Sequence, residues 1–169
     1  MLTARIRDRC PSASLRTLAY ASDFMVTFSK PSTDLSGKAT LVASDAAGPA
    51  VIGAVFEIST SDLDNLIRAE GSGYYRYDDF PLTCLRTGES ITADTYLAQE
   101  HRGHLKPYDW YLALVIAGIV EHKLDPKYVS AFRAIDYDID TDTCRKSRQT
   151  AISVLQRAGY RDYTALLRK

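Results

Sequence analysis

Glu70 is the side chain whose place in the sequence best suits acid–base chemistry. It ends a segment in which apolar residues such as Leu63 and Ile67 recur at helical spacing, and Gly71 follows it directly. This pattern predicts a short helix from about Ser61 that stops at the glycine. A carboxylate in the last turn faces the negative end of the helix dipole, which disfavours its charged form, and enclosure by neighbouring tyrosines would act in the same direction. We interpret Glu70 as a candidate general acid and base, the alternative being a solvated glutamate before a helix stop.

Two histidines form the nearest approach to a metal-ligand pattern. His101 and His104 are three residues apart beside Glu100, a spacing that could bring two imidazoles together on one helical turn. Gly103 and the charged neighbours instead predict a loop. We therefore predict no metal site.

Other reactive motifs are incomplete. Ser36-Gly37-Lys38 resembles the end of a phosphate-binding loop, but Ser32 stands where that motif requires its first glycine. Glu57 lies between two apolar residues, a pattern that predicts a solvent-facing strand residue. The sequence has neither a Gly-x-Ser-x-Gly elbow nor a dinucleotide fingerprint.

Composition narrows the class of protein. The 169 residues, 46% of them hydrophobic, suit one globular domain, and 21 basic residues balance 21 acidic ones. This balance predicts no nucleic-acid or membrane partner. The three cysteines, Cys10, Cys84 and Cys144, are widely spaced and odd in number, which favours a reducing compartment. The longest apolar run, Tyr111 to Val120, is shorter than the roughly 18 residues of a spanning helix, and no signal-peptide pattern opens the chain. We expect a cytoplasmic protein.

The elements that must position Glu70 are mostly strands before it and helices after it. Apolar alternation predicts strands at Leu18 to Phe28, Ala39 to Val42, Val51 to Ile58, Tyr75 to Arg86 and Ser90 to Ala98. Turn residues are Pro31, Ser36, Gly37, Gly48, Pro49 and Gly88, and Pro81 predicts an edge or a bulge. A capping box at Ser61 and Asp64 is predicted to start the helix that leads to Glu70.

The helical part follows the strands. Helices are predicted at Tyr108 to His122, buried on nearly all sides, from Pro126, and at Cys144 to Arg157, which is polar and amphipathic. The first ten residues predict a short helix or turn without an apolar stripe. Because strands and helices do not alternate as βαβ units, we expect an α+β fold with a mainly antiparallel or mixed sheet.

Several segments together resemble the γ-glutamylcyclotransferase family, in order and spacing, over roughly positions 1 to 135. They are Met1-Leu2-Thr3-Ala4-Arg5-Ile6, Arg9-Cys10-Pro11-Ser12-Ala13, Ser36-Gly37-Lys38-Ala39-Thr40, Val51-Ile52-Gly53-Ala54-Val55-Phe56, Glu70-Gly71-Ser72-Gly73-Tyr74-Tyr75, Thr95-Tyr96-Leu97-Ala98, and the stretch from Pro107 to Leu124. The resemblance implies one domain over residues 1–169, a mixed β-barrel or sheet with flanking helices, and a C-terminal helical extension at 142–169.

The resemblance also implies roles for four residues. Glu70 would be the catalytic acid and base, and Tyr75, Tyr96 and the turn at Gly37 would line the substrate pocket. The implied reaction releases 5-oxoproline from a γ-glutamyl amine or dipeptide by cyclisation, a transferase or lyase chemistry without a cofactor. A small γ-glutamyl molecule is the expected partner, and the oligomeric state is left open, with a homo-oligomer among the alternatives.

The family opens with a strand and a Tyr-Gly-Ser-Asn loop whose backbone amides hold the substrate. That loop is expected directly before Met1, and the sequence does not contain it. Either the natural protein starts upstream, or the chain is a catalytically inactive binding module with the same fold, or a neighbouring chain supplies the strand. In the first case an extended form is expected to be more active.

Overall fold

A computed structural model describes residues 1–44 and 51–168 and confirms the α+β class. The chain divides into two compact units. We call Arg9–Leu105 the strand unit, and Met1–Asp8 with Lys106–Lys169 the helical unit. The organisation of 1–169 as a single domain stays a prediction.

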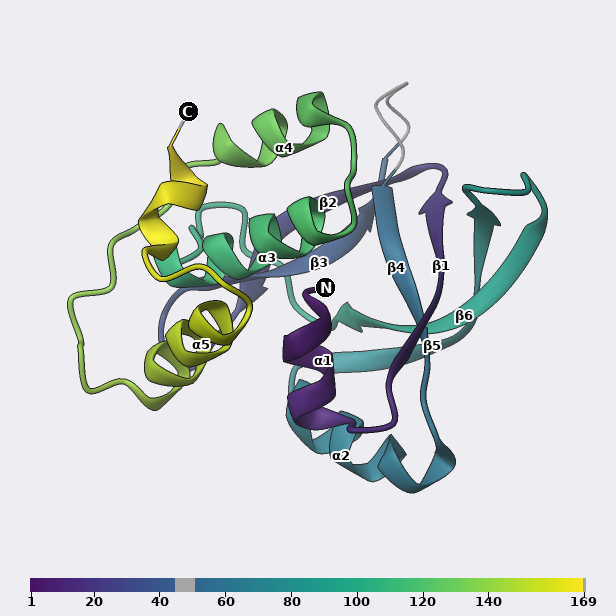
Figure 1. The fold of residues 1–169 in the computed structure, drawn as a ribbon, viewed down its shortest axis with the longest axis horizontal. Helices are drawn as coiled ribbons and strands as arrows, with labels where there is room; N and C mark the ends of the chain where they lie inside the picture. Colours follow the sequence, from purple (N-terminus) through teal and green to yellow (C-terminus); the bar gives the residue numbers. More distant parts are fainter. Residues whose placement is uncertain (45–50, 169) are drawn as a thin grey trace. The chain divides into compact units, whose positions relative to one another are not determined.

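The strand unit contains two antiparallel sheets within its described residues (Figure 1). One has the order β4-β1-β5-β6 and the other pairs β2 with β3. The strands are β1 (Ser14–Ala21), β2 (Phe24–Pro31), β3 (Gly37–Ala43), β4 (Val51–Glu57), β5 (Tyr74–Cys84) and β6 (Ser90–Ala98). The strands predicted at Ala39 to Val42, Val51 to Ile58, Tyr75 to Arg86 and Ser90 to Ala98 are confirmed, with ends that differ by a few residues. The predicted stretch from Leu18 to Phe28 instead forms parts of two strands, β1 and β2, with a turn at residues 22–23 between them.

The turn between β2 and β3 is tighter than the sequence suggests. Pro31 and Gly37 are not turn residues but the last paired positions of the two strands. A Cβ on Gly37 would lie 1.9 Å from the carbonyl oxygen of Phe28, so only glycine lets the two strands approach here. The predicted turn at Gly48 and Pro49 lies outside the described residues.

The long hairpin of β5 and β6 is irregular where proline was expected to disturb it. The register shifts between Tyr77 and Phe80, and Asp79 has a positive φ of 53°. Pro81 follows this shift, which confirms the predicted bulge. Gly88, with φ 74°, lies in the connection to β6.

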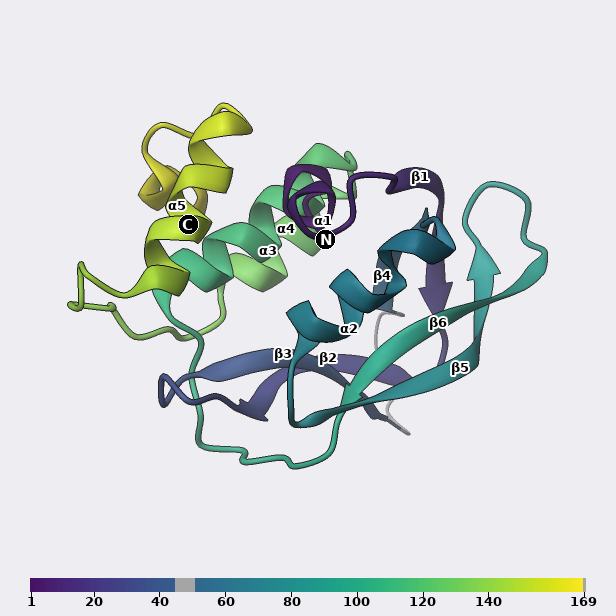
Figure 2. The ribbon, with the colours of Figure 1, turned by 90° about the horizontal axis from the view of Figure 1, so that it is seen from below.

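The turn η1 (Thr60–Asp62) and the helix α2 (Leu63–Glu70) connect β4 to β5 (Figure 2). The predicted capping box at Ser61 is wrong. The side chain of Ser59 accepts the Ser61 N–H at 3.4 Å and so caps η1, while Asp62, before α2, makes no side-chain cap. A short 3₁₀ turn therefore precedes the helix, and α2 starts two residues after Ser61.

The helical unit is organised around α3 (Asp109–Glu121), which contacts α4 (Pro126–Arg133), α5 (Lys146–Arg157) and η2 (Tyr163–Leu167). Nine of the 13 residues of α3 are buried, which confirms the helix predicted to be apolar on nearly all sides. Pro126 opens α4 as predicted, with Asp125 as its cap, while α5 begins at Lys146 rather than at Cys144. Among the described residues no helix combines the length and apolar character needed to cross a bilayer.

The first residues form α1 (Thr3–Arg9), and the prediction that they lack an apolar stripe is wrong. Leu2, Ile6 and Cys10 recur every four positions and are all buried. A stripe of one apolar residue per turn is narrow, and the four charges around it conceal it in the sequence. In the helical unit the backbone of Leu2 lies close to α3, since a Cβ on Gly118 would be 2.8 Å from the Leu2 nitrogen.

Candidate functional site

Glu70 is the last residue of α2, as predicted, and its side chain is largely buried, with 17% exposed. The helix stops because Gly71 has φ 69°, and the Gly71 N–H still bonds the Ile67 carbonyl at 3.2 Å. Gly73, with φ 89°, completes the turn into β5. The two glycines therefore end the helix directly after Glu70 and leave its carboxylate in the last turn.

Arg9 holds one oxygen of this carboxylate. Its Nη1 donates to Glu70 Oε1 at 2.8 Å, and the Arg9 side chain is 20% exposed. Within the described residues the Glu70 side chain makes no other hydrogen bond or ion pair, so its second oxygen, Oε2, is available to a ligand. Glu70 is therefore fixed through one oxygen, and the other oxygen has no partner among the described residues.

The segment that contains Arg9 holds α2 at both ends. At the start of the helix, the Ser12 N–H and Oγ–H both donate to Asp62 Oδ2, at 2.9 and 2.6 Å. Ser12 Oγ also accepts the Ser59 N–H at 2.9 Å. The helix that carries Glu70 is thus fixed in position by a short stretch of the chain, from Arg9 to Ser12.

Tyr96 lies within the electrostatic influence of Glu70. Burial raises the pKa of the Tyr96 hydroxyl, Arg76 opposes this, and the charge of Glu70 adds to it. The phenol therefore stays protonated and can donate a hydrogen bond. Its place in a pocket shared with Glu70 stays a prediction.

The predicted partner Tyr75 has a different orientation. In the β5–β6 ladder Tyr75 pairs with Leu97, whereas Tyr96 pairs with Arg76. Successive residues of a strand point to opposite faces, so Tyr75 and Tyr96 lie on opposite sides of this hairpin. Tyr75 is 44% exposed. Its place in the same pocket stays a prediction.

Gly37 is buried at the start of β3. The closeness of the Phe28 carbonyl oxygen leaves no room for a side chain, which explains a glycine at this position on structural grounds alone. Its strand partner Pro31 is next to Lys30, whose ammonium donates to the Ser72 carbonyl at 3.3 Å. The β2–β3 pair is thereby connected to the turn after Glu70. A substrate contact by Gly37 itself stays a prediction.

Sequence reasoning missed two basic residues of this neighbourhood. Arg9 stands inside one of the family-like segments, but its partner Glu70 is 61 positions away and nothing in the sequence pairs them. In the sequence Lys30 resembles any lysine of a strand. In the structure it is only 9% exposed, and its Nζ lies 4.6 Å from the centre of the Tyr74 ring. Both contacts are long-range, so local patterns carry no signal for them.

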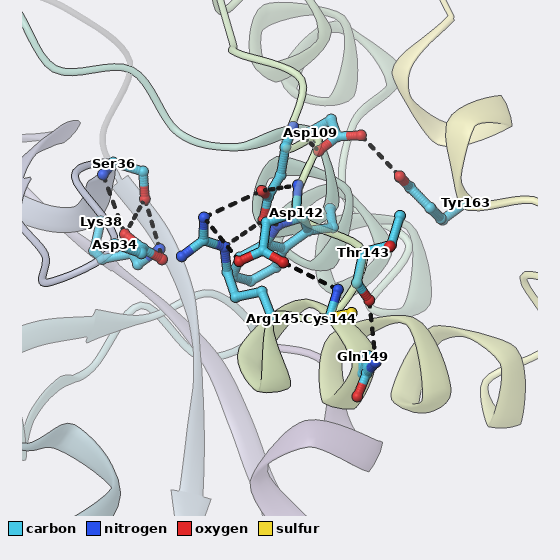
Figure 3. Close-up of polar contacts among 12 residues, drawn as sticks. Asp34, Ser36, Lys38, Asp109, Asp142, Thr143, Cys144, Arg145, Gln149 and Tyr163 are labelled. Atoms are coloured by element: carbon cyan, nitrogen blue, oxygen red, sulfur yellow. Dashed lines mark hydrogen bonds and ion pairs between the residues drawn. The ribbon is translucent and has the colours of Figure 1, made fainter.

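The segment considered as a phosphate-binding loop forms a local network (Figure 3). Asp34 accepts hydrogen bonds from Ser36 Oγ and from Lys38 Nζ, both at 2.7 Å. Burial would raise the pKa of Asp34, but the hydrogen bonds from Lys38 and Ser36 lower it to about 2. These residues brace the turn between β2 and β3.

One histidine of the pair, His101, contacts β2. The Nδ1 atom of His101 forms a hydrogen bond with Ser29 Oγ at 3.0 Å. Among residues 1–44 and 51–168, no three histidine, cysteine, aspartate or glutamate side chains group as metal ligands.

Comparisons with known proteins agree on one family. The model of the AIG2-like family matches residues 50–132. The human protein Gamma-glutamylcyclotransferase is 29% identical over 143 residues, which are 80% of this chain and 74% of the human protein.

Solved structures share the fold. A structure named gamma-glutamyl cyclotransferase aligns with a TM-score of 0.77 at 27% identity, covering 90% of this chain and 92% of the other. The crystal structure of an uncharacterised human protein aligns with the same TM-score and coverage at 28% identity.

Proposed function

Because this chain belongs to the γ-glutamylcyclotransferase-like, or AIG2-like, family, we propose that it releases 5-oxoproline from a γ-glutamyl amine or a γ-glutamyl dipeptide. The observation that carries this proposal is the state of Glu70. Its carboxylate ends a helix stopped by glycine and is held through Oε1 by Arg9, while Oε2 has no hydrogen bond or ion pair with any residue of the described part of the chain.

The reaction joins two groups of one molecule. Glu70 takes a proton from the α-ammonium of the γ-glutamyl group, and the resulting amine attacks the γ-carbonyl carbon. The new C–N bond closes a five-membered ring, Glu70 returns its proton to the leaving nitrogen, and the former amide C–N bond breaks. The ring nitrogen gives up its second proton, which the released amine takes up to leave as an ammonium ion. The products are 5-oxoproline and a free amine, and no water is consumed.

The protein contributes position more than reactivity. Holding amine and carbonyl together in one bent chain supplies the proximity that an intramolecular reaction needs. Arg9 fixes the carboxylate, so that one group can serve first as base and then as acid. Tyr96, which stays protonated, is our candidate for a hydrogen-bond donor to the developing oxyanion.

A substrate panel tests this proposal. The purified chain is incubated with γ-glutamyl alkylamines, γ-glutamyl dipeptides and, as a control, α-glutamyl dipeptides, and 5-oxoproline is quantified by liquid chromatography. Release from γ-linked compounds alone is expected. Calorimetric binding of γ-linked compounds without release would favour the inactive binding module, and neither binding nor release would refute the proposal.

A further inference from the structure

Two lysines face each other across the β2–β3 pair. Lys30 is directly opposite Lys38 in the register, so their side chains leave the same face of the sheet. Like charges in this position repel one another. The Lys38 ammonium is neutralised, because its Nζ lies 2.7 Å from Asp34 Oδ2 (Figure 3). The charge of Lys30 is therefore the one that needs explanation.

Lys30 is buried, and no described residue serves as its counter-ion. It is 9% exposed, and its contacts in the described part of the chain are one long hydrogen bond to the Ser72 carbonyl, at 3.3 Å, and the face of the Tyr74 ring. An ammonium group has three N–H donors, so donors remain for a further acceptor. A buried charge without a partner is costly, which makes an anion a favourable addition here.

The ammonium is also placed beside the turn that follows the candidate base. Ser72 is two residues beyond Glu70, in the turn that ends α2. A Cβ on Gly73 would lie 3.1 Å from Lys30 Cε and 3.4 Å from Nζ, so the end of the lysine side chain packs closely against this turn. The donor group and the candidate base thus border the same short segment.

We propose that Lys30 binds the α-carboxylate of the γ-glutamyl substrate, an inference that rests on the function proposed above. The α-amine and α-carboxylate are bonded to the same carbon, so a group that binds the carboxylate has to lie within a few ångströms of the base that serves the amine. The Lys30 ammonium contacts the carbonyl of Ser72, two residues after Glu70, and so lies beside the segment that carries the candidate base. A carboxylate on the leaving amine would lie several bonds farther away.

Decarboxylated substrates test this role. A 4-aminobutanoyl amide lacks only the α-carboxylate and cyclises to 2-pyrrolidinone by the same steps. In Lys30→Met, kcat/KM for the γ-glutamyl amine is expected to fall by about 10- to 100-fold, as for loss of a hydrogen bond to a charged group. Activity on the 4-aminobutanoyl amide should change little. Equal losses on both compounds, or no loss on either, would overturn the assignment.

A binding measurement separates this inference from the proposed function. By calorimetry, wild type should bind 5-oxoproline more tightly than 2-pyrrolidinone, and Lys30→Met should lose that preference whether or not turnover is seen. A wild type without preference would overturn the inference, even if it is an active enzyme. If wild type is inactive but keeps a preference that depends on Lys30, the inference holds for a binding protein and the proposed enzyme falls.

Two control variants show whether the preference depends on the charge at position 30. Lys38→Met removes the facing lysine, which is already paired with Asp34, and should leave the preference for 5-oxoproline intact in any sample that melts cooperatively. Lys30→Arg should retain part of the preference, since it keeps a charged donor. A Lys30→Met loss confined to γ-glutamyl dipeptides, with γ-glutamyl alkylamines unaffected, would assign the lysine to the leaving group and contradict the proposal.

Discussion

The Arg9–Glu70 pair shows how one contact can serve both stability and chemistry. Both side chains are largely buried, and the pair spans 61 positions of the sequence. Removing one partner of such a pair leaves the other charge uncompensated, which costs more than the net worth of the pair. Arg9 is therefore a positioning residue whose loss is expected to affect the reaction through Glu70.

Replacement of Arg9 tests this role. Arg9→Met is expected to lower kcat at least about tenfold with a smaller change in KM, because a misplaced base affects the proton transfers more than binding. Arg9→Lys should recover part of the rate, since it keeps the charge without the planar fork. The control is Arg16→Met, whose exposed pair with Glu57 at 3.7 Å should matter little. Equal kcat values for Arg9→Met and Arg16→Met would contradict the role.

Acid titration tests the Asp34 network. Because hydrogen bonds from Lys38 and Ser36 lower the pKa of Asp34 from 3.8 to about 2, the carboxylate adds stability above pH 4 that is lost as the pH falls through about 2. Wild type should exceed Asp34→Asn by about 2 kcal/mol in unfolding free energy at pH 6. Chemical denaturation between pH 6 and 2 should show this difference shrinking. A difference independent of pH would mean that another effect of the substitution dominates.

The sequence revealed Glu70 but not its partners. A glutamate before glycine at the end of a periodic segment is a local signal, and the structure has that helix and that stop. Arg9 and Lys30 act through contacts that only the folded chain creates. Local periodicity carries no information on which distant side chain reaches a given carboxylate or turn.

Strands and helices were predicted well where the apolar period is long, as in the long β5–β6 hairpin and in α3. The errors lie at short elements. The cap before α2 comes from Ser59 rather than Ser61, because an unforeseen 3₁₀ turn precedes the helix. The buried stripe of α1 has only one apolar residue per turn, and the charged residues around it hide this period in the sequence.

The β2–β3 pair offers a test at the level of the strands. Gly37→Ala would place a Cβ 1.9 Å from the Phe28 carbonyl oxygen, a backbone clash that the strands can relieve only by separating. We expect it to destabilise the fold by about 3 kcal/mol or more, measured by thermal or chemical denaturation. Gly53→Ala in β4 is the matched control, since nothing lies within 4 Å of its Cβ. Similar melting temperatures for the two variants would show that the close approach at Gly37 is not required.

Over the whole molecule, the order of several weak motifs predicted the family and the α+β fold, and the comparisons and the structure support both. Each motif is short, but the order and spacing of the motifs over most of the chain are specific for the family, because a fold fixes the order and spacing of its elements. The substrate is less predictable, since what distinguishes one γ-glutamyl compound from another is the leaving amine, and no motif in the chain describes it.

The decisive measurement is 5-oxoproline release from a γ-glutamyl amine by wild type, Glu70→Gln and Glu57→Gln. Glutamine keeps the shape of glutamate but cannot exchange a proton, and Glu57 is an exposed glutamate at the end of β4. Wild type and Glu57→Gln should release 5-oxoproline at similar rates, and Glu70→Gln should be slower by about a hundredfold or more while melting as a folded protein. A Glu70→Gln rate within a few-fold of wild type would contradict the assignment of Glu70 as general acid and base.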